Sequence, residues 1–227
     1  MRIGVVLSGC GVQDGSEIHE ATLTLLCLDR AGVEAVCCAP DRPQATVINH
    51  ATGTPLAETR NVLAESARIA RGKIQSLTAV DADALDGVIL PGGYGAARNL
   101  CDFAGRGAQC QVDPDLERLL RDLHRQGKPI GALCIAPVLL ARVFGDEHPL
   151  LTVGNDPDAI RQIEAMGGRH RAAGVGEIVV DERLRFVTTP AYMLAQRITE
   201  AATGIERLVD AVVTLARHSA HPTKQRK

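Results

Sequence analysis

Short apolar runs rich in Val and Ile recur along the chain, and segments with helical spacing separate them. Before residue 134 these runs cover residues 3–7, 33–39, 87–90 and 129–133. Their apolar residues are continuous rather than alternating, which is typical of parallel strands covered by helices on both faces. The pattern therefore predicts four buried strands of a mostly parallel sheet.

Capping residues mark the helices that lie between these strands. A helical pattern over residues 16–30 is followed by Gly32, which suits the left-handed turn that often ends a helix. Asp-Pro pairs at 113–114 and 156–157 each open a further helix. Aspartate caps the free N–H groups of a first turn, and proline suits the first helical position.

The alternation of strands and helices predicts right-handed crossovers and a doubly wound α/β sheet. Two later runs, 177–180 and 185–188, flank a polar turn and predict an antiparallel hairpin at an edge of the sheet. A last helix is expected over residues 191–217. Residues 1–217 thus form a single domain, and the polar, basic residues 218–227 are expected to be a disordered tail.

Residues 49–73 interrupt this alternation between the second and third predicted strands. They resemble a helical insertion, and the sequence does not reveal its purpose. No internal repeat or linker accompanies them, so they are expected to belong to the same domain.

The composition is that of an ordinary globular domain and narrows the possible partners. Of 227 residues, 45% are apolar and 23% charged, and the formal net charge is -2. Nothing here attracts nucleic acid or an acidic membrane, and aromatic residues for stacking on bases make up only 2%. The N-terminal apolar run is too short for a signal peptide or a membrane span. We therefore expect a cytoplasmic protein that binds neither nucleic acid nor a membrane.

The cysteines show no pattern of a disulfide framework or a zinc site. There are seven, an odd number, in a chain that is not small and secreted. No CxxC pair or zinc-finger spacing occurs, so we expect no metal and no cofactor. Cys27, Cys37 and Cys38 lie in apolar runs and suit small core positions. Only the surroundings of Cys134 indicate chemistry.

Cys134 follows the fourth predicted strand in the segment GALCIAP, residues 131–137. A strand that runs into a small-residue turn and then a helix matches a nucleophile elbow. Its thiol would point into the crevice where open α/β sheets bind ligands, and the helix N-terminus would lower its pKa. On this motif alone, a structural cysteine buried at a strand end remains an alternative.

A glycine-rich loop, LPGGYG at residues 90–95, follows the third predicted strand. It lacks the GxGxxG spacing of a dinucleotide site, and a bare turn is the alternative. Beside an elbow cysteine, however, such a loop can place backbone N–H groups around an oxyanion. We expect Gly93 and Ile135 to supply these donors, with Gly92 in the same substrate-binding loop.

A third candidate is Glu20, which lies in the first turns of the helix after the first strand. Asp14 and Glu17 have the spacing of a capping box, so Glu17 receives a structural role. Glu20 is then free to hydrogen-bond the sulfur of Cys134, unless it is a solvated helix carboxylate. His19 should point away from this site.

Together these residues resemble the DJ-1/PfpI branch of the class I glutamine amidotransferase-like superfamily. Within it the chain looks very similar to the ElbB group, named for an enhancing lycopene biosynthesis protein. The segments that carry the resemblance span almost the whole chain: SGCGVQDGSEIHEA, INHATG, ETRNVL, LPGGYGAA, CIAP and VTTPAYMLAQ.

The resemblance implies a flavodoxin-like fold, usually a homodimer, and a glyoxalase activity that needs neither glutathione nor metal. It places Cys134 on the family nucleophile, Glu20 on the glutamate beside the thiol and Gly93 on the anion-binding loop. Many superfamily members carry a His about 20 residues after the nucleophile, where this chain has Gly154 and Asn155. His148 is a weak substitute, because it precedes a proline in a loop.

Three functions remain open. The first is a slow, cofactor-independent glyoxalase of the lyase type, which converts glyoxal and related small aldehydes to hydroxy acids such as glycolate through a Cys134 thiohemiacetal. The alternative is a redox-responsive or regulatory binding protein with vestigial catalysis, because an exposed low-pKa cysteine oxidises readily. A small-molecule amidotransferase subunit ranks last, since glutamine hydrolysis relies on the missing His.

Overall fold

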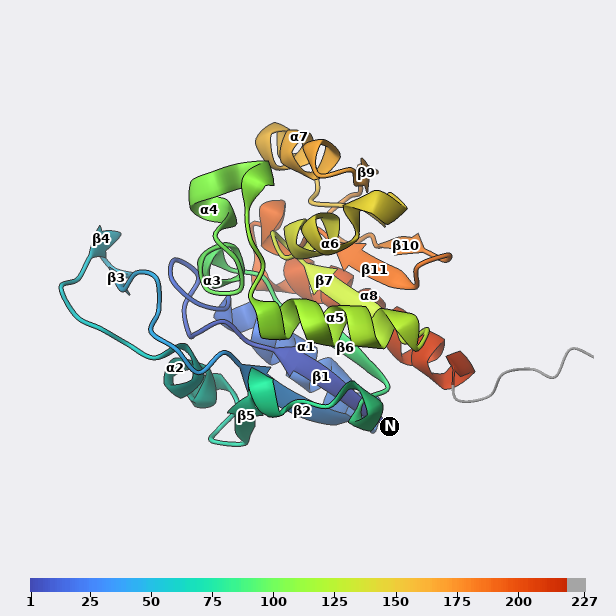
Figure 1. Cartoon of the computed structure of the whole chain (residues 1–227), viewed down its shortest axis with the longest axis horizontal. Helices are drawn as coiled ribbons and strands as arrows, with labels where there is room; N and C mark the ends of the chain where they lie inside the picture. Colours follow the sequence, from blue (N-terminus) through green and yellow to red (C-terminus); the bar gives the residue numbers. More distant parts are fainter. Residues whose placement is uncertain (220–227) are drawn as a thin grey trace, which may run out of the picture.

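A computed structural model describes residues 1–219, which fold around one seven-stranded sheet. The strands lie in the order β10-β11-β7-β6-β1-β2-β5, and every neighbouring pair is parallel except β10 with β11 (Figure 1). This is the flavodoxin-like, doubly wound arrangement, in which the chain starts mid-sheet and winds toward each edge in turn. The strands are β1 Arg2–Val6, β2 Glu34–Ala39, β5 Ile74–Ser76, β6 Gly87–Leu90, β7 Ile130–Leu133, β10 Val179–Asp181 and β11 Phe186–Thr189.

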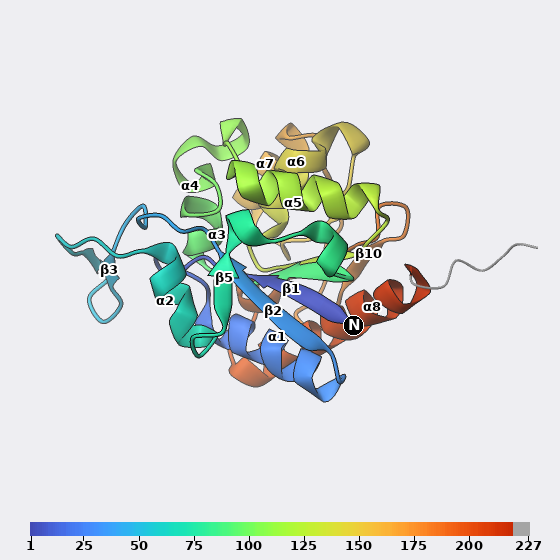
Figure 2. The ribbon, with the colours of Figure 1, turned by 60° about the horizontal axis from the view of Figure 1, so that its bottom comes forward.

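Helices cover both faces of this sheet. α1 (Ile18–Arg30) and α8 (Ile198–Ser219) pack together on one face, whereas α5 (Pro114–Arg125) and α6 (Pro137–Phe144) cover the other (Figures 1 and 2). The remaining helices are α2 Val62–Ile69, α3 Tyr94–Arg98, α4 Phe103–Arg106 and α7 Pro157–Ala165. Short 3₁₀ turns cover Leu77–Ala79, Ala82–Ala84, Gly107–Gln109, Gly145–Glu147 and Ala191–Met193.

The core is split into two layers by the sheet, as the continuous apolar runs predict. Leu116 and Leu119 of α5 lie fully buried in the layer on one face. Leu28 of α1 and Leu208 of α8 do the same on the other. Strands buried on both faces need apolar side chains at every position, which is why their sequences do not alternate.

The predicted strands and the edge hairpin are confirmed, and the last helix starts later than expected. β10 forms the edge, while β11 is an interior strand that pairs with β7. The chain does not turn directly into α8 after β11, because a 3₁₀ turn at Ala191–Met193 comes first. Of the predicted tail, the first two residues continue α8, and residues 220–227 lie outside the described residues. Within residues 1–219, no helix has both the length and the apolar character that crossing a membrane requires.

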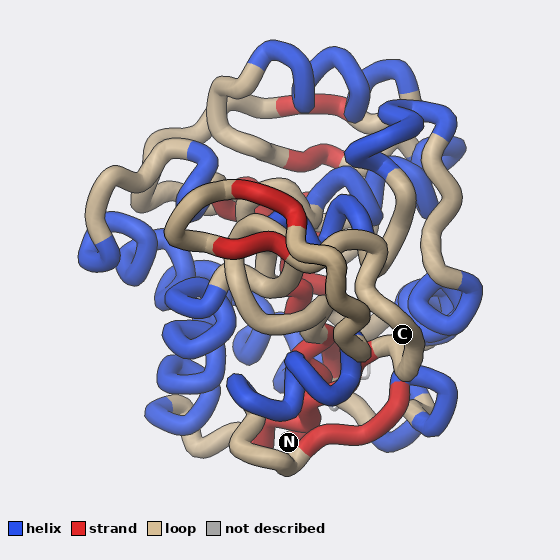
Figure 3. The backbone as a smooth tube through the Cα atoms, turned by 90° about the vertical axis from the view of Figure 1, so that its left-hand side faces the viewer, coloured by secondary structure: helices blue, strands red, loops and turns tan. Residues whose placement is uncertain are grey.

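The expected helical insertion is only partly helical. It contains α2, but its first part forms a hairpin of β3 (Ile48–Asn49) and β4 (Thr54–Pro55). The hairpin and the exposed residues after it project from the molecule, and Figure 3 shows this arm in front of the other elements. A second small sheet, β8 (Leu150–Leu151) with β9 (Arg169–His170), lies beside α7.

Asn99 ties the loops at the carboxyl end of the sheet together. It is 2% exposed, and its side-chain amide donates to the carbonyl oxygens of Ser8 and Asp14, both at 2.8 Å. Its Oδ1 accepts from the N–H of Ala45 at 2.9 Å. One side chain thus holds the loop after β1 against the segment that leads into the projecting arm.

We expect Asn99→Ala to lower the free energy of unfolding by about 3 kcal/mol, because it leaves three backbone groups without partners. Urea denaturation checks this, with Asn155→Ala as the matched control because Asn155 is exposed. Equal, small effects of the two substitutions would contradict the role of Asn99.

Candidate functional site

Cys134 lies on a strained turn between β7 and α6. Its φ is +57°, in the left-handed region that residues other than glycine rarely adopt. Its N–H donates to the carbonyl oxygen of Thr189 at 3.0 Å, so the turn is fixed against the end of β11. This is the elbow geometry that the sequence predicts, and backbone strain of this kind is characteristic of functional sites.

Glu20 lies directly against this thiol, in the first turn of α1, and is fully buried. The N–H of Gly92 donates to its Oε2 at 2.8 Å, and the N–H of Tyr192 donates to its Oε1 at 3.2 Å. A third hydrogen bond joins its carboxyl group to Cys134. Four segments far apart in the sequence therefore meet at one carboxyl group.

Glu20 and Cys134 both have raised pKa values. Burial, and then the nearby charge of Glu17, raise the pKa of Glu20 from 4.5 to about 7, although its hydrogen bonds from Tyr192, Gly92 and Cys134 favour ionisation. Burial and the charge of Glu20 raise the pKa of Cys134 well above its ordinary value. Near pH 7 the pair therefore gives up one proton and holds the other, which lies between carboxylate and sulfur.

This corrects the expectation of a thiol with a lowered pKa. The N–H groups of Gly93 and Ile135 do stabilise a thiolate. Their contribution is smaller than the cost of removing the sulfur from water beside a carboxylate. Three donors aimed at the carboxyl group also favour its ionised form. In the resting state above pH 7, Cys134 is therefore the donor in its hydrogen bond with Glu20.

The glycine loop leaves no room for side chains. A Cβ on Gly92 would lie 2.5 Å from Cβ of Cys134 and 2.7 Å from Oε2 of Glu20. Gly93 has a φ of +95°, and a Cβ placed on it would collide with backbone atoms of Gly15 and Glu17. The sequence therefore needs glycine at both positions so that the loop can approach the thiol and the carboxyl group.

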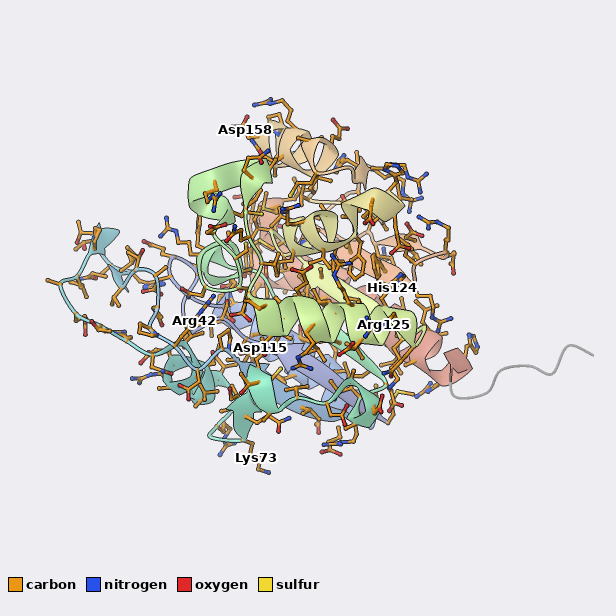
Figure 4. All side chains as sticks on the ribbon, in the orientation of Figure 1. Arg42, Lys73, Asp115, His124, Arg125 and Asp158 are labelled. Carbon is orange, nitrogen blue, oxygen red and sulfur yellow. The ribbon has the colours of Figure 1, made fainter. Side chains whose placement is uncertain are left out.

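A cavity of about 530 Å³ opens onto the sulfur, which lines it together with Gly93, Ile135 and Tyr192. Phe103 and Tyr94 form an aromatic wall, and Asp156, Asp158, Gln162 and Met193 are also in the lining. Figure 4 shows Asp158 on α7, where it forms an ion pair with Arg161. Among the described residues that line the cavity, none is basic. The carboxylates of Asp156 and Asp158 in this lining disfavour an anionic ligand.

Comparison with known proteins shows which family the chain belongs to. No family model matches the chain. The ES1 protein homolog, mitochondrial, of Rattus norvegicus is 45% identical over 224 residues, with 94% of this chain and 84% of the relative covered. The human glutamine amidotransferase-like class 1 domain-containing protein 3, mitochondrial, is also 45% identical. The match covers 94% of this chain and 83% of the human protein. The chain belongs to the ES1 family of glutamine amidotransferase-like class 1 domain proteins.

Solved structures share the fold of this ES1 family member. An Ehrlichia chaffeensis isoprenoid biosynthesis protein with an amidotransferase-like domain matches with a TM-score of 0.88 and 33% identity, over 94% of this chain and 99% of that one. Drosophila melanogaster DJ-1beta matches with a TM-score of 0.52 and 19% identity, over 95% of each chain. The second likeness shows the fold alone.

The expectation of a cytoplasmic protein was wrong. The rat, human and Danio rerio members of the ES1 family are all named as mitochondrial proteins. Composition cannot separate the two compartments, because each is aqueous and selects the same balance of apolar and charged residues.

Sequence reasoning missed two residues of this ES1 site. Tyr192 donates its N–H to Glu20, and its hydroxyl group hydrogen-bonds Nδ1 of His19 at 2.8 Å. His19 was expected to point away, but this bond places its ring beside a residue that lines the cavity. The segment VTTPAYMLAQ was noticed only for its resemblance. The proline that follows its apolar run was the signal in the sequence for a strand that ends at the site.

The positions considered for a catalytic histidine do not line the cavity. Nδ1 of His148 contacts the carbonyl oxygen of Gly167 at 2.8 Å, and His148 is not among the residues that line the cavity. Gly154 lies where the resemblance implies a histidine, and a Cβ there would lie 2.8 Å from Leu194. The expected capping box is also different, because Glu17 itself caps α1 by accepting from the N–H of Glu20 at 2.7 Å.

We expect Gly92→Ala to destabilise the fold by about 2–4 kcal/mol, because its Cβ collides with two buried groups that have no room to move. Gly105→Ala is the matched control: it is in the same cavity wall, its Cβ meets nothing within 4 Å and it lies in α4. That substitution should be neutral or stabilising by up to about 1 kcal/mol. Thermal and urea unfolding measure both, and similar values for the two would refute the close packing at Gly92.

The raised pKa of Glu20 makes stability depend on pH in a specific direction. As pH rises from 4.5 to about 7, Glu20 ionises in the unfolded chain but stays protonated in the folded chain. The free energy of unfolding therefore falls over this range. We expect the stability of Glu20→Gln relative to wild type to increase by about 3 kcal/mol between pH 4.5 and pH 8. Urea unfolding at both values tests this, with Glu182→Gln, an exposed acid, as control. A pH-independent difference would mean that Glu20 titrates normally.

Proposed function

We propose that this protein is a cofactor-independent glyoxalase that converts glyoxal and similar uncharged dicarbonyls to hydroxy acids through a covalent intermediate on Cys134. The observation that carries the proposal is the buried Cys134–Glu20 pair at the end of the cavity. A carboxyl group with a pKa of about 7 can both accept and return a proton near neutral pH. The homodimer that the resemblance implies is part of the same proposal.

The first step adds the thiol to the substrate. Glu20 accepts the proton of Cys134 while the sulfur attacks one aldehyde carbon, in the manner of a nucleophile activated by an adjacent base. The developing alkoxide is stabilised by the N–H groups of Gly93 and Ile135 and then takes the proton, which gives a hemithioacetal. The raised pKa of the thiol fits this step, because the base removes the proton only as the new bond forms.

In the second step, the carbon bonded to sulfur is oxidised and the other carbon is reduced. Glu20 removes the hydrogen of the carbon bonded to sulfur as a proton, and the oxygen of the second carbon takes up a proton, which gives an enediol. Addition of a proton to the second carbon and loss of the hydroxyl proton from the first gives a thioester of glycolate, and water cleaves this thioester to release glycolate and the thiol. One aldehyde is oxidised and the other is reduced, so the atoms and electrons balance without an external oxidant or reductant.

The alternative of redox sensing by Cys134 receives less support. A thiolate, not a thiol, reacts with oxidants, and burial raises the pKa of this thiol. Hydrolysis of glutamine also lacks support, because Gly154 replaces the histidine on which it relies. A regulatory binding protein could use the same cavity, and turnover separates it from the glyoxalase.

We expect glyoxal turnover to rise with pH through about 7, as Glu20 becomes the base, and to be slow because no imidazole assists. Cys134→Ser and Glu20→Gln should each lose at least about 10²-fold in kcat/KM. Glycolate formation measured by NMR checks this.

Cys10→Ser is the control, since Cys10 also lies in a loop at the end of a strand but is not among the residues that line the cavity. The proposal fails if Cys134→Ser turns over glyoxal like wild type, or if activity is absent in the wild-type protein.

A further inference from the structure

Residues 99–113, which we call the strap, join α3 to α5 and form one wall of the cavity at Cys134. Phe103 and Gly107 of the strap line that cavity. On its other side the strap borders a second cavity of about 430 Å³, lined by Cys101 and by Arg42 and Arg98. The strap contains only α4 and one 3₁₀ turn, so few helical hydrogen bonds hold its shape.

Two buried cysteines lie against each other inside the strap. The thiols of Cys101 and Cys110 interact with one another, and their residues are 3% and 0% exposed. Sγ of Cys101 also donates to the carbonyl oxygen of Ala96 at 3.3 Å. An antiparallel bridge pairs Cys101 with Val112, and the N–H of Asp113 donates to the carbonyl oxygen of Leu100 at 2.8 Å. The two ends of the strap, each of which carries one of the cysteines, are therefore held side by side.

These two cysteines differ electrostatically from the ordinary core cysteines. The hydrogen bond from Cys101 and the charge of Arg142 lower the pKa of Cys110, and Nε of Arg142 donates to the carbonyl oxygen of Cys110 at 2.6 Å. The same hydrogen bond and burial raise the pKa of Cys101. By contrast, burial raises the pKa of Cys37 to about 11. Two neighbouring thiols of this kind allow one to attack an oxidant and the other to resolve the product.

We propose that Cys101 and Cys110 form a reversible disulfide, oxidised by hydrogen peroxide, that changes the shape of the cavity at Cys134. The pair is independent of the proposed glyoxalase chemistry. The second cavity, which Cys101 lines, gives a molecule as small as peroxide a path to Cys101, beside Arg42, which Figure 4 labels near the start of α5.

The oxidation balances in two steps. The thiolate of one cysteine attacks one oxygen of hydrogen peroxide, which breaks the O–O bond and gives a sulfenic acid and, after protonation, water. The thiol of the other cysteine then attacks the sulfenic sulfur, which forms the S–S bond and expels a second water. Two thiols lose two electrons and two protons in total, and a dithiol reductant reverses the change.

Closing this bond acts on the cavity through the strap. A disulfide draws two sulfur atoms from contact to about 2.05 Å, so the ends of the loop that carries Phe103 and Gly107 must move closer. Because these two residues line the cavity at Cys134, their movement changes access to that sulfur. The structure thus connects a redox site in the strap with a thiol that it does not touch.

The test combines peroxide titration with peptide mapping. Trypsin cleaves after Arg98, Arg106 and Arg118, so the two cysteines fall in separate peptides, 99–106 and 107–118. We expect limited peroxide to link these peptides before Cys134 or Cys10 is oxidised, and dithiothreitol to separate them. Iodoacetamide labelling of Cys134 should slow in the oxidised protein and recover on reduction.

Cys101→Ser and Cys110→Ala should abolish both the link and the change in Cys134 labelling, whereas Cys37→Ser, another buried cysteine, should leave both intact. The wild-type map requires no variant, so it decides the question even if a variant fails to fold. A map in which Cys101 and Cys110 stay free while other cysteines are oxidised would overturn the site. A link that leaves Cys134 labelling unchanged would overturn its effect on the cavity.

Discussion

The buried contact between the Glu20 carboxyl group and the Cys134 thiol is the constraint on which the rest of the site depends. Two acidic groups removed from water cannot both ionise at neutral pH, so they hold one proton between them. The protein reduces this cost by aiming backbone N–H groups at both partners. An arrangement that is expensive for stability therefore becomes a source of a mobile proton beside a nucleophile.

Glycines and a few polar side chains make this contact possible. Gly92 lets a loop approach both members of the pair, and its carbonyl oxygen accepts from the N–H of Glu17, which caps α1. Asn99, at the start of the strap, donates hydrogen bonds to the neighbouring loop that follows β1. The loops at the carboxyl ends of β1, β6, β7 and β11 are thus coupled, and movement of one wall reaches the others.

How far the sequence predicts this protein can be judged from particular elements. Continuous apolar runs located β1, β2, β6 and β7 to within one residue at either end, because strands buried on both faces leave little freedom in composition. The short strand β5 and the β3–β4 hairpin were missed. Such short pieces are set by their neighbours rather than by their own pattern.

The sequence by itself determined the fold class and singled out Cys134 as the candidate nucleophile, because elbow spacing is a local requirement. It left Glu20 open between a partner of the thiol and a solvated helix carboxylate, and only the tertiary structure brought the two groups together. Only the tertiary structure decided which of them holds the proton. That outcome depends on how completely α1, the loop at Gly92 and the turn at Tyr192 exclude water from one point. Desolvation is a property of all the atoms around a group, and those atoms come from segments that are distant in the sequence.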